Sequence, residues 1–143
     1  MFCFPVRVYY SDTDAEGIVY HTHYLDFAEH ARTEMFRSLS IKTQGGEVSQ
    51  RTLLEKSGLA FVISSVSADF KKPGLLDDLL EVRTSISSIK RFSMVFDQKV
   101  MRGDELLVEL KVKVAAIDLS VRRPTPVPQW LVDAILSEGH LSS

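Results

Sequence analysis

The spacing of apolar residues changes twice along the chain. Between Val6 and Tyr10 every second side chain is apolar, which predicts a short strand. From Thr22 to Leu39 apolar residues recur every three or four positions, which is typical of an amphipathic helix. A helix of this length would measure about 27 Å at ~1.5 Å per residue. The apolar stripe of this predicted helix consists of Tyr24, Phe27, Ala28, Ala31, Met35, Phe36 and Leu39.

The second half of the chain returns to the alternation that indicates strands. Residues 61–70 are of types that favour strands, although their alternation is imperfect. Gly103-Asp104 indicates a two-residue hairpin, because a type II′ turn requires glycine at its first central position. Three later runs alternate between apolar and polar residues and predict further strands, at 80–86, 92–100 and 106–116.

Three remaining segments complete the pattern. A short helix is expected from Pro128 to Leu136, because proline is favoured in the first turn of a helix. Residues 43–50 contain Gly45-Gly46 and are expected to form a loop. The tail from Gly139 onward has no apolar periodicity, so we expect it to be frayed.

The order of these elements predicts an α+β fold. One strand, a long helix and four strands follow each other, and short turns between successive strands favour antiparallel pairing. Each strand has one apolar face and the helix has one apolar stripe. The economical packing is a curved antiparallel sheet of about five strands wrapped around the central helix, in a single domain over residues 1–143.

Composition limits the classes of function. Lys and Arg number 17 and Asp and Glu 19, so the net charge of −2 argues against a general nucleic-acid binder. Hydrophobic residues make up 45%, and no run approaches the ~20 apolar residues of a membrane-spanning helix, so we expect a soluble protein without membrane insertion. No signal peptide is visible at the start, and the single Cys3 cannot form an internal disulfide. Both features favour a cytoplasmic protein.

Groups with chemical potential are concentrated just before the predicted long helix. Asp12, Asp14, Gly17, His21 and His23 lie within twelve residues. The first turn of a helix presents unpaired N–H groups and a partial positive charge, which would polarise a carbonyl oxygen placed there. A carboxylate slightly upstream, across a turn that glycine permits, could reach the same position as a base or nucleophile. The pattern indicates acyl transfer or hydrolysis.

The two carboxylates also fit two roles outside catalysis. An Asp-x-Asp pair before a helix is often only turn-forming and capping chemistry. The run from Asp12 through Asp14 to Glu16-Gly17 also matches the first half of a calcium-binding EF-hand loop. The twelfth position of such a loop should be a bidentate Glu and is His23 here, and the segment before it alternates like a strand.

A zinc site is the alternative role for the histidines, His21, His23 and His30. Histidines two positions apart point to opposite sides of a strand, or about 200° apart on a helix. No cysteine pair and no His-Glu-x-x-His helix accompanies them. We therefore expect neither a metal site nor another cofactor.

An ordered set of residues in this region carries a family resemblance: Tyr10, Asp12-Thr13-Asp14, Gly17, Val19-Tyr20-His21, Tyr24, Phe27, Glu29 and Ala31-Arg32-Thr33. The set resembles the signature of hotdog-fold acyl-CoA thioesterases of the 4-hydroxybenzoyl-CoA thioesterase type. It is most similar to the bacterial subgroup encoded beside the Tol-Pal envelope genes. Weaker resemblance extends through Ala68-Asp69-Phe70 to about Pro126. The hotdog fold, a sheet wrapped around a central helix, agrees with the periodicity.

The resemblance implies roles for individual residues. Asp14 would be the catalytic carboxylate, either as general base on water or as nucleophile on the thioester carbonyl, whereas Asp12 would be a turn residue. The backbone N–H of His21 would bind the thioester oxygen, and its side chain would help to orient water or substrate. Gly17 and Tyr24 belong to the same motif and are expected at the substrate site.

Coenzyme A carries phosphates, so basic residues should lie near its binding site. Lys90-Arg91 stands at the turn between two predicted strands, where the aryl-CoA enzyme type has phosphate contacts. Arg122-Arg123 and Lys71-Lys72 are further candidates. For each pair the alternative is an ordinary solvated strand end, and this alternative is favoured for Arg122-Arg123 and Lys71-Lys72.

The leading hypothesis is hydrolysis of an acyl-CoA thioester to a carboxylic acid and free coenzyme A, in lipid metabolism. Acyl carrier protein is an alternative carrier of the acyl group. Two other functions stay open: a hotdog-fold enoyl-thioester hydratase, and a non-catalytic module that binds acyl-CoA or acyl carrier protein. The family implies active sites shared between subunits, so we expect a homo-oligomer, either a dimer or a tetramer formed as a dimer of dimers.

Overall fold

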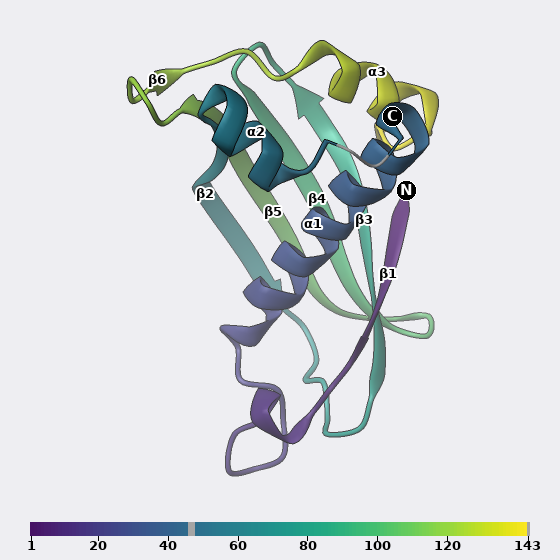
Figure 1. Cartoon of the computed structure of the whole chain (residues 1–143). Helices are drawn as coiled ribbons and strands as arrows, with labels where there is room; N and C mark the ends of the chain where they lie inside the picture. Colours follow the sequence, from purple (N-terminus) through teal and green to yellow (C-terminus); the bar gives the residue numbers. More distant parts are fainter. Residues whose placement is uncertain (46–47, 143) are drawn as a thin grey trace.

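The computed structural model describes residues 1–45 and 48–142, and it forms one curled antiparallel sheet with a long helix across its concave face (Figure 1). The strands run in the order β1-β3-β4-β5-β2, and the two-residue β6 adds to β5. In chain order the elements are β1 (Phe2–Arg7), the 3-10 helix η1 (Tyr10–Asp12), α1 (His23–Gln44), α2 (Gln50–Ser57), β2 (Leu59–Phe70), β3 (Leu79–Ile89), β4 (Ser93–Arg102), β5 (Glu105–Asp118), β6 (Arg123–Pro124) and α3 (Gln129–Ser137).

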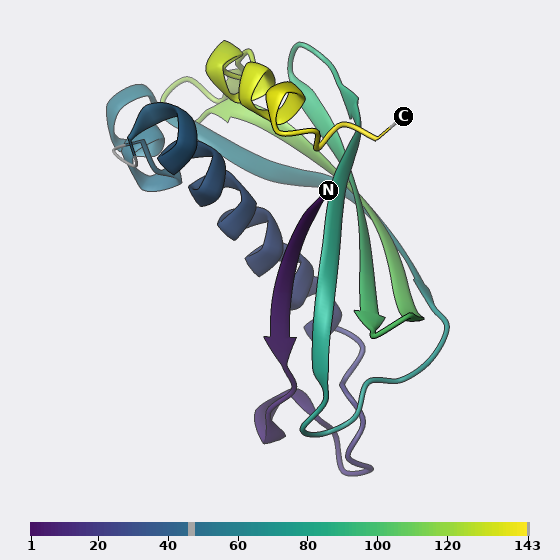
Figure 2. The same ribbon diagram turned by 90° about the vertical axis from the view of Figure 1, so that its right-hand side faces the viewer.

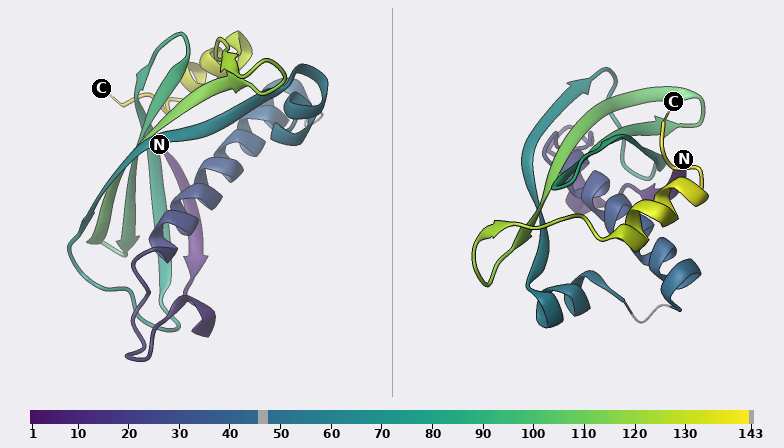
Figure 3. Two further views of the ribbon diagram at one scale, coloured as in Figure 1. Left: turned by 90° about the vertical axis from the view of Figure 1, so that its left-hand side faces the viewer. Right: turned by 90° about the horizontal axis from the view of Figure 1, so that it is seen from above.

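The sheet bends around α1, as the views from the side and from above show (Figures 2 and 3). Alternate side chains of β3, β4 and β5 point to the helix and are almost fully buried, as at Val82, Val100 and Val112. All seven apolar positions of the predicted helical stripe are buried as well. The core therefore lies between the concave face of the sheet and one face of α1, which is the hotdog architecture expected from the sequence.

The long helix is confirmed and extends further than expected. α1 contains 22 residues and ends where Gly45 adopts a positive φ of 68°, a backbone conformation that glycine takes without strain. The expected end at Leu39 was too early because the apolar stripe stops there while helical residues continue. The C-terminal turns therefore project beyond the main core with mostly polar side chains.

Two expectations at the sheet were tested directly. The hairpin at Gly103-Asp104 is confirmed, because Arg102 pairs with Glu105. Gly103 has a positive φ of 59° and the φ of Asp104 is not positive, as a type II′ turn requires.

The first strand was misplaced, because β1 covers Phe2–Arg7 and Tyr10 begins the short helix η1. The alternation already starts at Phe2, and Pro5 fits there because β1 is an edge strand.

The regions expected to be irregular are largely ordered. Within 43–50, α1 continues to Gln44, residues 46–47 lie outside the described part, and α2 starts at Gln50. Sequence periodicity missed α2 because it is short and mostly polar, although the Ser49 side chain caps it by accepting the N–H of Thr52 at 3.0 Å.

The C-terminal tail was also wrongly expected to be frayed. His140 is buried, and its carbonyl accepts the N–H of Ile86 at 2.8 Å. The N–H of Ser142 then donates to the carbonyl of Ile86, also at 2.8 Å. The tail thus follows β3 beside a bulge between Ile86 and Ser88, next to the N-terminus, whose ammonium donates to the carbonyl of Gly139. These backbone contacts could not be seen in the polar tail sequence.

A polar network crosses the otherwise apolar layer between α1 and the sheet. Gln98 of β4 is fully buried, and its amide nitrogen donates to the carbonyl of Ala28 at 2.9 Å and to the hydroxyl of Thr84 at 3.0 Å. Its amide oxygen accepts from the guanidinium of Arg32 at 2.9 Å. Because α1 contributes both Ala28 and Arg32, the network determines where along the sheet the helix lies.

In the described part of the chain, no helix is long and apolar enough to cross a membrane.

Candidate active site

The loop of residues 13–19 folds back on itself between η1 and α1. Asp14 N–H donates to the carbonyl of Ile18 and Tyr20 N–H to the carbonyl of Asp12, both at 2.9 Å. The turn at its tip uses Gly17, which has a φ of 78° that other residues rarely adopt. The 13–19 loop therefore places Asp14 on one arm and the residues leading to His21 on the other.

Asp14 is exposed, and its described contacts stay within this loop. One carboxylate oxygen accepts the N–H of Glu16 at 2.8 Å, and its carbonyl accepts the N–H of Gly17 at 3.1 Å. This is the side-chain turn geometry typical of aspartate. The second carboxylate oxygen has no protein partner among the described residues. Asp14 thus has one oxygen that orients the carboxylate and one oxygen available for chemistry.

Asp12 has a different environment from Asp14. Its carboxylate accepts the backbone N–H of Tyr9 at 2.8 Å, and its other oxygen lies 3.1 Å from Nδ1 of His23. His23 is the first residue of α1, so this contact joins the turn of η1 to the start of the helix. With both carboxylate oxygens engaged, Asp12 serves the structure of the turn.

His21 lies two residues before α1 on the surface. Its ring packs 4.5 Å from the ring of Tyr20 and 6.2 Å, edge-on, from the ring of Phe70 at the end of β2. In the described residues, the backbone N–H groups of His21 and Thr22 donate to no protein acceptor. These N–H groups at the start of a helix are suited to bind a carbonyl oxygen or oxyanion.

Tyr24 is in the core rather than at an open surface. It is 3% exposed, and its hydroxyl accepts the backbone N–H of Gly74 at 2.8 Å. Burial is the main cause that raises the pKa of this phenol, against the opposing effect of the Gly74 hydrogen bond. Its expected place at the substrate site is still a prediction, while its contact with Gly74 is a structural role that the sequence did not reveal.

Residues 72–78, between β2 and β3, form a segment that carries the 13–19 loop. Val19 N–H donates to the carbonyl of Gly74 at 2.9 Å, and Leu76 N–H donates to the carbonyl of Gly17 at 3.1 Å. A Cβ at Gly74 would approach Val19 to 3.1 Å and the Tyr24 hydroxyl to 3.3 Å, so glycine permits the close approach. Pro73-Gly74 reads in the sequence only as a turn signal, which is why this supporting segment was missed.

The structure does not bring Lys90 and Arg91 together with Asp14 within one chain. Both basic residues are exposed at the β3–β4 turn, and Arg91 packs its guanidinium 5.1 Å from the ring of Phe92. β3 spans 11 residues, about 36 Å at ~3.3 Å per residue, and its other end adjoins the 72–78 segment. The turn and the 13–19 loop therefore lie at opposite ends of the sheet (Figure 1).

The other basic pairs are divided between these two ends. Lys71 directly precedes the 72–78 segment and Lys72 begins it, so both lie at the Asp14 end. Lys71 pairs with Asp69 at 3.0 Å and Lys72 with Glu105 at 2.8 Å. Arg122-Arg123 lies at β6, beside the end of β5 that pairs with the start of β2.

A cavity of about 140 Å³ lies between α1 and the sheet, beyond the first turns of the helix. Its walls are largely apolar, and Arg32 and Glu29 are among its polar lining residues. Burial lowers the pKa of Arg32, although the guanidinium keeps its hydrogen bond to Gln98.

Among the described residues, no group of three or more His, Cys, Asp or Glu side chains is arranged to hold a metal ion.

Comparison with known proteins identifies the family. The model of the thioesterase-like superfamily matches residues 8–135. An acyl-CoA thioesterase, YbgC, of Haemophilus influenzae is 45% identical over 128 residues, covering 90% of this chain and 89% of its own length. The acyl-CoA thioester hydrolase YbgC of Escherichia coli O157:H7 is 39% identical over 133 residues, covering 92% of this chain and 93% of its own length.

Solved structures agree with this assignment. A probable thioesterase from Bartonella henselae is 32% identical with a TM-score of 0.76, and the match covers 88% of this chain and 98% of that one. A 1,4-dihydroxy-2-naphthoyl-CoA thioesterase from Synechocystis, at 24% identity, shares the fold with a TM-score of 0.82 over 97% and 98% of the two chains. From its sequence and its fold, this chain belongs to the thioesterase-like superfamily.

Proposed function

We propose that the protein hydrolyses acyl-CoA thioesters to a carboxylic acid and free coenzyme A. The observation that carries the proposal is the arrangement of the 13–19 loop: an exposed carboxylate on one arm and, after the other, backbone N–H groups at the start of α1 without a described acceptor. Two relatives that are 39–45% identical and match nine tenths of the chain are named acyl-CoA thioesterases or hydrolases. Their names support coenzyme A as the carrier.

The proposed reaction uses Asp14 and the backbone near His21. The thioester oxygen accepts from the His21 N–H, which stabilises the negative charge that develops on it. Asp14 takes a proton from water while the water oxygen bonds to the carbonyl carbon; the C–S bond then breaks, and the thiolate leaves and is protonated. In the nucleophilic alternative, an oxygen of Asp14 bonds to the carbonyl carbon, the C–S bond breaks, and the thiolate leaves and is protonated. Water then hydrolyses the resulting anhydride, which releases the carboxylic acid and restores the Asp14 carboxylate.

The edge strand β2 supports an assembly of two or more copies. Within the described part of the chain β2 is unpaired along one side, and it exposes the apolar side chains of Val62, Ile63, Val66 and Phe70. Exposed apolar edges favour pairing with another strand. Two-fold antiparallel pairing of β2 with its copy would bring the β3–β4 turn of one subunit to the Asp14 end of the other. Coenzyme A phosphates would then contact Lys90 and Arg91 of the partner subunit.

Sedimentation tests this assembly. We expect the wild-type protein to sediment as a dimer or a dimer of dimers, and Ile63→Glu to weaken the association, because a charge at an edge strand opposes pairing. A monomer with full activity would contradict the shared site. In that case Lys71 and Lys72, at the Asp14 end of the same chain, become the better candidates for phosphate contacts.

The direct test of function is release of free thiol from a panel of acyl-CoA thioesters. We expect thiol release with saturated acyl groups, whereas an enoyl-thioester hydratase would release none. Tight acyl-CoA binding without turnover would instead indicate a binding module. We expect a chelator to leave the rate unchanged, since the proposed steps use only protein groups and water. A loss that added zinc restores would contradict that expectation.

The carrier and the compartment complete the proposal. Acyl carrier protein is the alternative carrier, and thiol release from acyl-carrier-protein substrates compared with coenzyme A substrates decides between the two. A cytoplasmic location agrees with the single, exposed Cys3, and a role in lipid metabolism is part of the same proposal. The genomic association with the Tol-Pal envelope genes stays a prediction.

A further inference from the structure

The position of Asp14 depends on a segment that is distant in sequence. The described hydrogen bonds of Asp14 remain inside the 13–19 loop, so the loop as a whole must be held by its neighbours. Residues 74–76 hold it through two backbone hydrogen bonds, which together form an antiparallel bridge between Ile18 and Leu75. Gly74 also donates to the Tyr24 hydroxyl, so the same segment contacts the start of α1.

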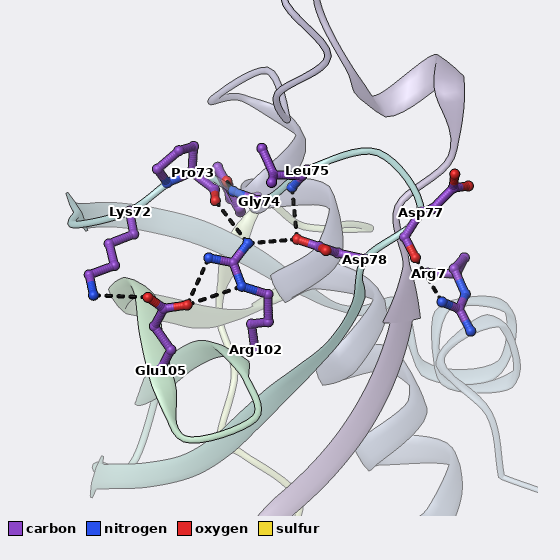
Figure 4. A network of polar contacts seen from close by, with 10 residues as sticks. Arg7, Lys72, Pro73, Gly74, Leu75, Asp77, Asp78, Arg102 and Glu105 are labelled. Atoms are coloured by element: carbon purple, nitrogen blue, oxygen red, sulfur yellow. Dashed lines mark hydrogen bonds and ion pairs between the residues drawn. The ribbon is translucent and has the colours of Figure 1, made fainter.

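A single guanidinium organises this segment (Figure 4). Nη1 of Arg102 donates to the Asp78 carboxylate at 2.7 Å and to the carbonyl of Pro73 at 3.2 Å. The same carboxylate oxygen of Asp78 accepts the N–H of Leu75 at 2.9 Å. Arg102 therefore joins both sides of the turn, and Leu75 is tied to it through Asp78.

The other side of the guanidinium is fixed by Glu105. Nε and Nη2 of Arg102 both donate to one oxygen of Glu105, at 3.1 and 2.7 Å, while Lys72 binds the other oxygen at 2.8 Å. Arg102 and Glu105 flank the tight β4–β5 hairpin, which is part of the rigid sheet. The planar fork of arginine can contact both acidic groups at once, and the single ammonium of lysine cannot reproduce that geometry.

We propose that Arg102 is a positioning residue for thioester hydrolysis. It anchors the 72–78 segment to the sheet, and this segment in turn holds Asp14 and the start of α1 in place. The inference rests on the proposed function, in which these two groups act on the same carbonyl. Arg102 has no described contact with either group. The far end of the segment is independently held, because Asp77 and Asp78 form backbone hydrogen bonds with Val8, so losing Arg102 loosens the Pro73–Leu75 part and leaves the fold in place.

The test compares arginine variants in steady-state kinetics with an acyl-CoA substrate. We expect Arg102→Gln to lower kcat by about 10- to 100-fold, because a displacement of about 1 Å at reacting groups can cost that much. KM should stay within about twofold, because the side chain does not touch the substrate. Arg102→Lys should have a kcat between those of Arg102→Gln and the wild type. Asp78→Asn should lower kcat about as much as Arg102→Gln does.

Arg83 offers a matched control. It is an arginine on β3 with similar exposure, paired with Glu81 at 2.7 Å and without a described contact to the 72–78 segment. Arg83→Gln removes the ion pair with Glu81 and a 3.4 Å hydrogen bond to the carbonyl of Gly103, and kcat should not change. Amide hydrogen exchange gives a second readout: Arg102→Gln should accelerate exchange at Val19 and Leu76, while amides in the centre of β4 and β5 keep their protection.

The outcomes separate the two proposals. A lower melting temperature for Arg102→Gln with unchanged kcat, or exchange that accelerates throughout the sheet, would show that Arg102 only stabilises the fold and would overturn the inference. If Arg102→Gln does not fold, Arg102→Lys and Asp78→Asn carry the same test. Full activity of Asp14→Asn would instead overturn the assignment of Asp14, whatever Arg102 does.

Discussion

The hydroxyl of Tyr24 accepts the backbone N–H of Gly74 at 2.8 Å, across fifty residues of sequence. This contact joins the first turn of α1 to the segment that carries the 13–19 loop. The start of α1, where we propose that the oxyanion binds, and the loop that contains Asp14 are thus attached to the same piece of backbone. Their relative position is a property of long-range contacts, and each of these contacts can be altered singly.

Removing the Tyr24 hydroxyl should destabilise the protein. Tyr24→Phe leaves the N–H of Gly74 without its acceptor in a buried site, which costs about 1–3 kcal/mol. Urea unfolding measures the change. Tyr10→Phe is the control, because Tyr10 is 82% exposed, and it should alter the unfolding free energy by less than about 0.5 kcal/mol. Equal stability of wild type and Tyr24→Phe would show that water replaces the phenol.

Asp14→Asn should abolish most turnover without loss of fold. Asparagine retains the oxygen that accepts the N–H of Glu16, but it can neither take a proton from water nor attack the carbonyl. We expect kcat to fall by about 10²–10⁴-fold, the usual contribution of a general base. Circular dichroism should be unchanged. Glu16→Gln is the control in the same loop; if it removed activity while Asp14→Asn did not, Glu16 would be the catalytic carboxylate.

The Gln98 network should contribute to stability more than an exposed amide does. Gln98→Leu leaves the half-buried Arg32 guanidinium and the buried Thr84 hydroxyl without their partner. Because hydrogen bonds to charged groups are worth about 1.5–3 kcal/mol, we expect a loss in that range in denaturant unfolding. Gln129→Leu, at an exposed position of α3, is the comparison and should be nearly neutral. A Gln98→Leu variant as stable as wild type would show that apolar packing compensates for the network.

His140 should make stability depend on pH below neutrality. It is buried, its Nδ1 has no hydrogen-bond partner among the described residues, and burial is the largest cause that lowers its pKa, followed by the charge of the N-terminal ammonium. Lys42 lowers this pKa further, and Glu138 opposes the shift. As pH falls below the ordinary value of 6.5, the unfolded chain takes up a proton that the folded protein resists, so the unfolding free energy decreases.

Unfolding measured between pH 7 and about 5 checks this dependence. His140→Leu should flatten the decrease, and His30→Gln, on the exposed face of α1, should retain it. Glu105 and Asp118 contribute a second pH dependence, at lower pH than His140, because hydrogen bonds lower the pKa of both carboxyl groups. Their stabilisation is present above their ordinary values of 4.5 and 3.8 and is lost at lower pH. An unchanged slope in His140→Leu would assign the dependence to other groups.

Local patterns in the sequence were sufficient for the main architecture. The helical spacing from Tyr24 to Leu39 and the alternation in the later runs reflect burial against one face, so they identify the core directly. Gly103-Asp104 encodes its own turn geometry. The motif around Asp14 and His21 indicated thioester chemistry, and family membership agrees with it. The roles of individual site residues remain predictions.

Contacts between segments that are distant in sequence decided the features that no local pattern predicts. The tail after Gly139 is ordered by backbone hydrogen bonds with Ile86, which is distant in sequence. Lys90 and Arg91 resemble a phosphate site in the sequence, yet a strand of 11 residues separates them from the end that carries Asp14. The supports of Asp14, from Gly74 to Arg102, come from separate turns and strands. Their hydrogen bonds depend on how the sheet curls around α1, because the curl decides which residues far apart in the sequence lie close together.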